Sequence, residues 1–209
     1  MILSGGPTLV ILLIAFLVSA IIIVERSVYF NNRQFRPSEL LLEAGGLLER
    51  NKSGELKERF RKDISAAGYV LLECLSFTED QPSFHPDHFE EVKNRAIAEK
   101  IPEMERFLAI LATLGSVSPF IGLLGTVLGI IRAFVSLDMG SKGAEGLNAG
   151  IAEALIATAA GLIVAIPSTI AYNLFKKKVE AILLNIEVAA SRLKMLIVLN
   201  YKRKGDITL

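Results

Sequence analysis

Two long uncharged runs in the second half of the chain restrict its fold more than any other feature of the sequence. Residues 107–131 contain no charged side chain, and neither do residues 154–175. A helix needs roughly 20 apolar residues to cross the hydrocarbon core of a bilayer, and each run exceeds that length. A third uncharged run covers residues 2–24. These runs predict an all-α integral membrane protein with three transmembrane helices.

The composition excludes several other classes of protein. Hydrophobic residues make up 52% of the 209-residue chain and the mean hydropathy is +0.47, which is high for a soluble domain. The net charge is only +1 and no basic patch is interleaved with aromatic residues, so a nucleic-acid partner is not expected. The spans hold no nucleophile–base pair and no set of metal ligands, so neither an enzyme nor a metal site is expected. His85, Asp87 and His88 are expected in a solvated loop.

The distribution of basic residues predicts the orientation of the three helices. The first run has no basic residue before it and no small-x-small cleavage site before Glu25, which favours a retained helix over a cleaved signal peptide. Arg26, Arg33 and Arg36 follow this run, and three lysines at 176–178 follow the third run. Because basic loops remain in the cytoplasm, the N-terminus is expected outside and the C-terminus inside.

This topology divides the chain into six expected segments. They are a first transmembrane helix (residues 1–24), a cytoplasmic helical domain (25–106), a second transmembrane helix (107–135), a periplasmic loop (136–148), a third transmembrane helix (149–175), and a cytoplasmic helical extension with a basic tail (176–209). The second and third helices are expected to extend into the cytoplasm. Within the cytoplasmic domain, helical periodicity predicts one helix near residues 40–48 and another at about residues 55–77.

Small residues recur along one face of the second and of the third transmembrane helix. Such stripes let helix backbones approach closely, as in ordinary membrane-helix packing. The residues assigned to helix packing are Gly115, Gly122, Gly125, Gly129, Ala157 and Gly161. Pro119 and Pro167 lie within the two spans and are expected to kink them, because proline removes a backbone donor.

Two threonines and one glutamate lie beside these stripes. Thr126 and Thr158 each lie eight residues inside the expected outer end of their helix, so both are about 12 Å deep. Glu153 lies five residues nearer the outside and about 140° around the helix from Thr158. A carboxylate within a membrane is typical of ion or proton movement. The alternative is a glutamate that snorkels to the interface, or a protonated structural acid.

Three motifs in the spans closely resemble the ExbB/TolQ/MotA family of proton-channel subunits. They are the segments 122–129 (GLLGTVLG), 150–161 (GIAEALIATAAG) and 165–167 (AIP). The resemblance implies a pentamer in the bacterial inner membrane, with a periplasmic N-terminus and a cytoplasmic C-terminus. Its second and third spans would line a pore holding a dimer of an ExbD/TolR-like single-span partner. Thr126, Thr158 and Glu153 match positions that the family uses along or beside this pore.

The resemblance therefore implies a non-enzymatic motor subunit with protons as the coupling ion and no cofactor. It would convert proton-motive force into mechanical work on a TonB-like or TolA-like protein, surrounded by membrane lipids. The length and three spans are more like ExbB or TolQ than MotA, which has four spans. An ExbB-like role in outer-membrane transport is the main interpretation. A TolQ-like role in envelope integrity and division, and a non-conducting membrane scaffold, are the alternatives.

Overall fold

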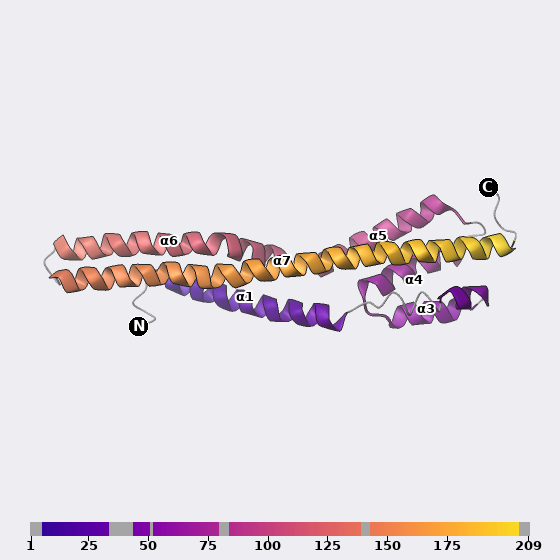
Figure 1. The fold of residues 1–209 in the computed structure, drawn as a ribbon, viewed down its shortest axis with the longest axis horizontal. Coiled ribbons are helices and arrows are strands. Elements are labelled where there is room, and N and C mark those ends of the chain that lie inside the picture. The colour runs from indigo at the N-terminus through magenta and orange to yellow at the C-terminus, as the bar shows by residue number, and fades with distance from the viewer. Residues whose placement is uncertain (1–5, 34–43, 51, 80–83, 139–142, 205–209) are drawn as a thin grey trace. The chain divides into compact units, whose positions relative to one another are not determined.

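A computed structural model describes residues 6–33, 44–50, 52–79, 84–138 and 143–204, and every regular element in these ranges is helical (Figure 1). The helices are α1 (Gly6–Asn32), α3 (Ser53–Lys62), α4 (Ala66–Glu79), α5 (Pro86–Met104), α6 (Leu108–Asp138) and α7 (Gly143–Lys204), with a short helical stretch at residues 44–49. Within these ranges α1, α6 and α7 are long and apolar enough to cross a membrane. The prediction of an all-α membrane protein with three candidate spans is confirmed. The ring-shaped assembly and the membrane limits of the six segments stay predictions.

The chain forms two compact units. Unit 1 consists of residues 1–28 and 107–176, and unit 2 consists of residues 29–106 and 177–209. The long helix α7 therefore contributes to both units, as does α1.

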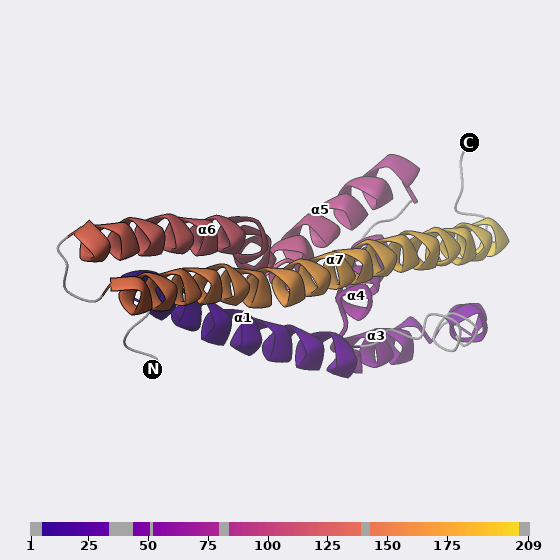
Figure 2. The same ribbon diagram turned by 60° about the vertical axis from the view of Figure 1, so that its left-hand side comes forward.

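Unit 1 is a three-helix bundle. Its helices α6 and α7 run antiparallel as a hairpin, with α1 alongside them (Figures 1 and 2). Leu12 and Ala15 of α1 pack with Val164 of α7, and three further apolar residues lie against this cluster: Leu114, Ile121 and Ala160. Large apolar side chains on the outer faces remain exposed in the single chain, as expected for helices that contact lipid or other subunits.

The second span begins at a backbone break. Phe107 has a φ of 65°, in the left-handed region that a bulky residue rarely adopts, between the end of α5 and the start of α6. The expected extension of the second span is therefore a separate helix, α5. The third span does continue, because α7 is one helix of 62 residues. Both α6 and α7 run on through their prolines, Pro119 and Pro167, and the kinks stay a prediction.

Unit 2 buries one apolar core between its short helices and the C-terminal part of α7. The core includes Phe60, Leu71, Phe89, Ile186 and Leu193, all at most 1% exposed. Ion pairs connect α5 to α7 beside this core. The Lys93 ammonium lies 2.7 Å from both Glu90 and Glu187, and Lys194 lies 2.7 Å from Glu90. Cys74 is a buried free thiol.

The single helix expected over residues 55–77 is wrong. The structure has two helices there, α3 and α4, separated at residues 63–65. The side chain of Asp63 accepts a hydrogen bond from the Ser65 amide at 2.8 Å, and the Ser65 hydroxyl accepts one from the Gly68 amide at 3.1 Å. Because serine satisfies the free amides at a helix start, this Asp-x-Ser sequence begins a new helix.

The histidines belong to a helix start rather than to a loop. Pro86 occupies the first turn of α5, so Asp87 and His88 are helical, and both are exposed as expected. The rings of His85 and His88 lie 5.3 Å apart. No group of three or more residues that could hold a metal occurs in the described ranges.

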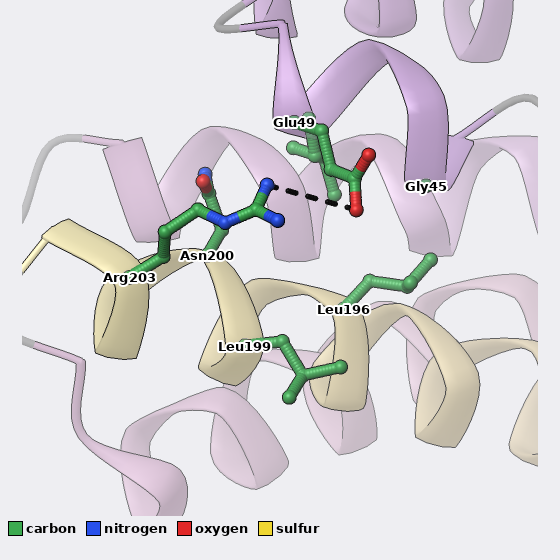
Figure 3. A pocket seen from close by; sticks show the side chains of 7 residues that line it. Gly45, Glu49, Leu196, Leu199, Asn200 and Arg203 are labelled. Atoms are coloured by element: carbon green, nitrogen blue, oxygen red, sulfur yellow. Dashed lines mark ion pairs between the residues drawn. The ribbon is translucent and has the colours of Figure 1, made fainter.

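A small pocket of about 210 Å³ lies in unit 2 between residues 45–49 and the end of α7 (Figure 3). Leucines form its apolar lining, and the Arg203–Glu49 ion pair spans its rim at 3.7 Å. The pocket is lined by Gly45, Leu48, Glu49, Leu196, Leu199, Asn200 and Arg203.

Candidate functional site

The two backbones of the α6–α7 hairpin approach each other closely at Gly122 and Gly161. A Cβ atom on Gly122 would lie 2.8 Å from the Ala157 carbonyl oxygen and 3.1 Å from the Thr158 Cα. A Cβ atom on Gly161 would lie 2.7 Å from the Ser118 carbonyl oxygen. The obstructing atoms belong to backbone and cannot move aside, so only glycine fits at either position.

The other predicted packing residues lie along the same contact line, and all six act within one chain. The successive contacts are Gly115 with Thr169, Gly125 with Ala157, and Gly129 with Ala154. These contacts set the register of the hairpin. The prediction that the same stripes join neighbouring chains is a separate statement and stays a prediction.

This register places Thr126 and Thr158 within about 3 Å of the same level, because each directly follows a residue of the Gly125–Ala157 contact and the two helices run in opposite directions. The Thr158 hydroxyl donates to the Gly122 carbonyl at 3.3 Å, and the Thr126 hydroxyl donates to the Leu123 carbonyl at 2.6 Å. Both threonines are half-buried. Thr126 and Thr158 are each about 120–160° around their helix from the residues that pack on α1. They therefore share the edge of the hairpin that faces away from α1.

Glu153 lies on the other side of the hairpin. It precedes Ala160 by seven residues and Val164 by eleven, spacings that return to the same helix face, and both residues pack with α1. Its Oε1 atom lies 3.7 Å from Nη2 of Arg132 on α6. The structure thus brings the two threonines together and separates Glu153 from them.

Arg132 is the residue that reading the sequence missed. It is the first charged residue after the uncharged run 107–131. Its sequence signal is that it is the one charged residue within the expected second span, 107–135. Arg132 lies eleven residues after Ile121, which places it on the α1-bearing face of α6, as Glu153 is on α7.

Several further hydroxyls lie inside unit 1, away from the candidate site. The Ser19 and Ser168 oxygens lie 2.7 Å apart, and the Ser168 hydroxyl also lies 2.7 Å from the Val164 carbonyl. Within the described ranges, the hydroxyls of Thr8 and Ser118 are buried without a hydrogen-bond partner. Isolated serines and threonines in an apolar run carry little signal, because they are also common where membrane helices simply pack.

The fold and this hairpin define a class: helical membrane proteins with two glycine-packed spans, here with one threonine of each span on a shared edge. Residues 56–188 match the model of the MotA/TolQ/ExbB proton channel family, and the chain belongs to this family.

The similar proteins include some named ExbB or ExbB-like and others named TolQ. An ExbB-like biopolymer transport protein of Synechocystis sp. is 31% identical over 83% of this chain and 82% of its own length. The Tol-Pal system protein TolQ of Haemophilus influenzae is 37% identical over 83% of this chain and 80% of its own. The biopolymer transport protein ExbB of Aquifex aeolicus is 48% identical over 47% of this chain and 66% of its own.

Proposed function

We propose that the chain is a non-enzymatic proton-channel subunit of an ExbB–ExbD-type motor. It converts proton-motive force into mechanical work on a TonB-like protein for outer-membrane transport. Membership of a proton channel family supports the channel role, and relatives named ExbB support the transport role. The single observation that carries the proposal is the pair of threonines at one level on the edge of the hairpin away from α1.

Hydroxyls suit contact with an acid that changes its protonation state. A threonine hydroxyl donates to a carboxylate and accepts from a carboxylic acid, so it serves both forms without a fixed counter-charge. Thr126 and Thr158 now donate to backbone carbonyls of α6, and their lone pairs remain available as acceptors. We expect the acid to be an aspartate on a dimeric, single-span ExbD/TolR-like partner. Protons are then the coupling ion, and no cofactor takes part.

The proposed assembly is a pentamer in the bacterial inner membrane, with the threonine edge of each subunit toward the central pore. Closed rings are the usual form of homo-oligomers whose interfaces are heterologous. The proposed orientation has a periplasmic N-terminus and a cytoplasmic C-terminus, as the basic residues predict.

The test compares valine substitutions at three threonines. Thr126→Val and Thr158→Val keep the side-chain shape but remove the hydroxyl. Each is expected to lower proton-gradient-dependent activity about tenfold, the scale of one lost hydrogen bond to a charged group. Thr113→Val is the matched control, because Thr113 is an exposed residue of α6 whose hydroxyl donates only to the Ala109 carbonyl at 2.9 Å. It is expected to be fully active.

Expression and partner co-purification are measured in parallel, because a complex that fails to assemble would also be inactive. If Thr126→Val and Thr158→Val assemble and keep full activity, the threonine layer is packing and the proposal is wrong. A non-conducting scaffold is then the better interpretation.

A TolQ-like role in envelope integrity and division is the second candidate. It is favoured by the 190-residue match to the Haemophilus TolQ protein. Expression of the chain in strains lacking either tolQ or exbB separates the two roles. Restored detergent resistance in the first strain supports the TolQ role, and restored energised uptake in the second supports the ExbB role.

A further inference from the structure

Arg132 and Glu153 form an ion pair between α6 and α7 on the face of the hairpin that carries α1. We propose that Arg132 is a positioning residue, which holds the Glu153 carboxylate against α6 and compensates its charge. Glu153 then connects α7 to α6 near the outer end of the hairpin, and it does not carry protons to or from the threonines. The activity measured in the test below rests on the proposed function, whereas the Arg132–Glu153 ion pair itself does not.

The burial of Glu153 calls for such a partner. Its Oε1 atom is buried and makes no hydrogen bond within the described ranges, although its side chain as a whole is 31% exposed. A carboxylate without compensation is costly inside a membrane, and such residues pair with opposite charges where they occur. Arg132 supplies the opposite charge, because its guanidinium is a cation that suits pairing with a carboxylate.

The position of Arg132 suits this role. Its Nε atom donates to the Leu128 carbonyl at 3.2 Å, so the side chain folds back along α6 toward the level of Glu153. That level is marked by the Gly129–Ala154 contact, directly beside Glu153. The Arg132 side chain is 53% exposed, so it pairs with the Glu153 carboxylate while about half of its surface stays accessible.

The same geometry separates Glu153 from the threonines of its own chain. Glu153 and Thr158 lie about 140° apart around α7. Glu153 shares its face with Ala160 and Val164, which pack on α1, so a rotation of α7 toward the threonine edge would disrupt that packing. A proton carrier would need access to the threonine layer, whereas an anchor between helices needs only its partner on α6.

A double-mutant cycle tests the assignment in the full-length chain, expressed with its partner proteins in cells lacking the native copy. Arg132→Gln leaves the Glu153 carboxylate without its partner and is expected to lower proton-gradient-dependent activity about tenfold, since an unpaired carboxylate is costly inside a membrane. Glu153→Gln is expected to be milder, because the freed arginine can reach the interface. The double variant Arg132→Gln/Glu153→Gln is expected to recover most of the lost activity, and Arg132→Lys to retain it.

The Arg203–Glu49 pair of unit 2 is the matched control. Its charged atoms also lie 3.7 Å apart, but the side chains are 69% and 66% exposed (Figure 3). Arg203→Gln, Glu49→Gln and their combination are expected to keep full activity, because an exposed ion pair contributes little. If these variants stay active while Arg132→Gln does not, the loss of activity comes from the partly buried position of Glu153 and not from removing an ion pair as such.

Two results overturn the inference. One is a double variant that assembles but stays as inactive as the worse single variant. Activity would then require the Glu153 carboxylate itself, as expected for a proton carrier. The other is an Arg132→Gln variant with full activity. Failure of the proposed function has a different signature: the valine variants at Thr126 and Thr158 are then fully active, whatever the Arg132–Glu153 cycle shows.

Discussion

Gly122 and Gly161 illustrate how single residues determine the packing of the spans. An alanine at either position would place its methyl group within 3 Å of a backbone carbonyl oxygen. We expect Gly122→Ala and Gly161→Ala each to destabilise the protein by about 1–3 kcal/mol, the usual effect of overpacking. The measurement is the melting temperature of the detergent-solubilised protein, which should fall for both variants.

Gly46 provides the control for this prediction. It lies in the short helical stretch at residues 44–49, and an added Cβ there meets no atom within 4 Å. Since alanine favours helix more than glycine does, Gly46→Ala should leave the melting temperature unchanged or raise it. Equal melting temperatures for all three variants would contradict the close contact between α6 and α7.

At the scale of the elements, charged networks hold unit 2 together. Hydrogen bonds from Lys194 and Lys93 lower the pKa of Glu90 below its usual 4.5. Burial would raise the pKa of Glu103, but hydrogen bonds from Arg33 and Lys100 lower it overall. The desolvation of Lys93 opposes its positive charge, and its two carboxylate partners outweigh that effect and raise its pKa. The paired, charged forms are therefore the ones that stabilise the fold.

These pKa shifts predict a loss of stability in acid. A carboxylate whose pKa is lowered by folding stabilises the native state above its unfolded pKa, and the contribution disappears as pH falls through the lower folded pKa. For Glu90 that window begins near pH 4.5 and extends downward. We expect Glu90→Gln to lower the melting temperature at pH 7 and to reduce its further decline between pH 5 and pH 3, both followed by circular dichroism.

Glu58→Gln is the control for the acid prediction. Among the described residues, Glu58 pairs with Arg61 of the same helix, α3, and its side chain is 56% exposed. Its replacement should leave both the melting temperature and the acid slope unchanged, because exposed pairs of this kind contribute little. A Glu90→Gln protein with the same acid decline as the unmodified chain would refute the role of the α5–α7 network.

At the scale of the whole molecule, the predicted orientation can be tested by thiol labelling in intact cells. A cysteine at position 141, in the loop between the second and third spans and outside the described residues, should react with a membrane-impermeant reagent that reaches the periplasm. A cysteine at Ser53, at the start of α3, should not. The reverse pattern would invert the topology that the basic residues predict.

The native cysteine does not interfere with this measurement. Burial raises the pKa of the Cys74 thiol to about 12, so very little thiolate, the reactive form, exists at neutral pH. Cys74 is also fully buried in the core of unit 2. The unmodified chain should remain unlabelled until it is denatured, and this serves as the baseline for both introduced cysteines.

The sequence by itself determined the class of protein and its three candidate spans. Length and lack of charge are properties of each run alone, and a bilayer imposes the same requirement on any such run. The sequence also predicted the glycines of the hairpin, because small residues at helical spacing describe one face of one helix. It failed at residues 55–77, where the capping residues Asp63 and Ser65 interrupt an otherwise continuous helical pattern.

Only the tertiary structure decided which polar residues meet. Helical periodicity relates side chains on one helix, but a contact between two helices also depends on their register and on which faces are covered. Here the register follows from backbone contacts at Gly122 and Gly161, and the covered face is the one on which α1 packs. These two facts put Thr126 and Thr158 on one edge of the hairpin and Glu153 with Arg132 on the opposite side, because close backbone contacts fix which turns of the two helices face each other.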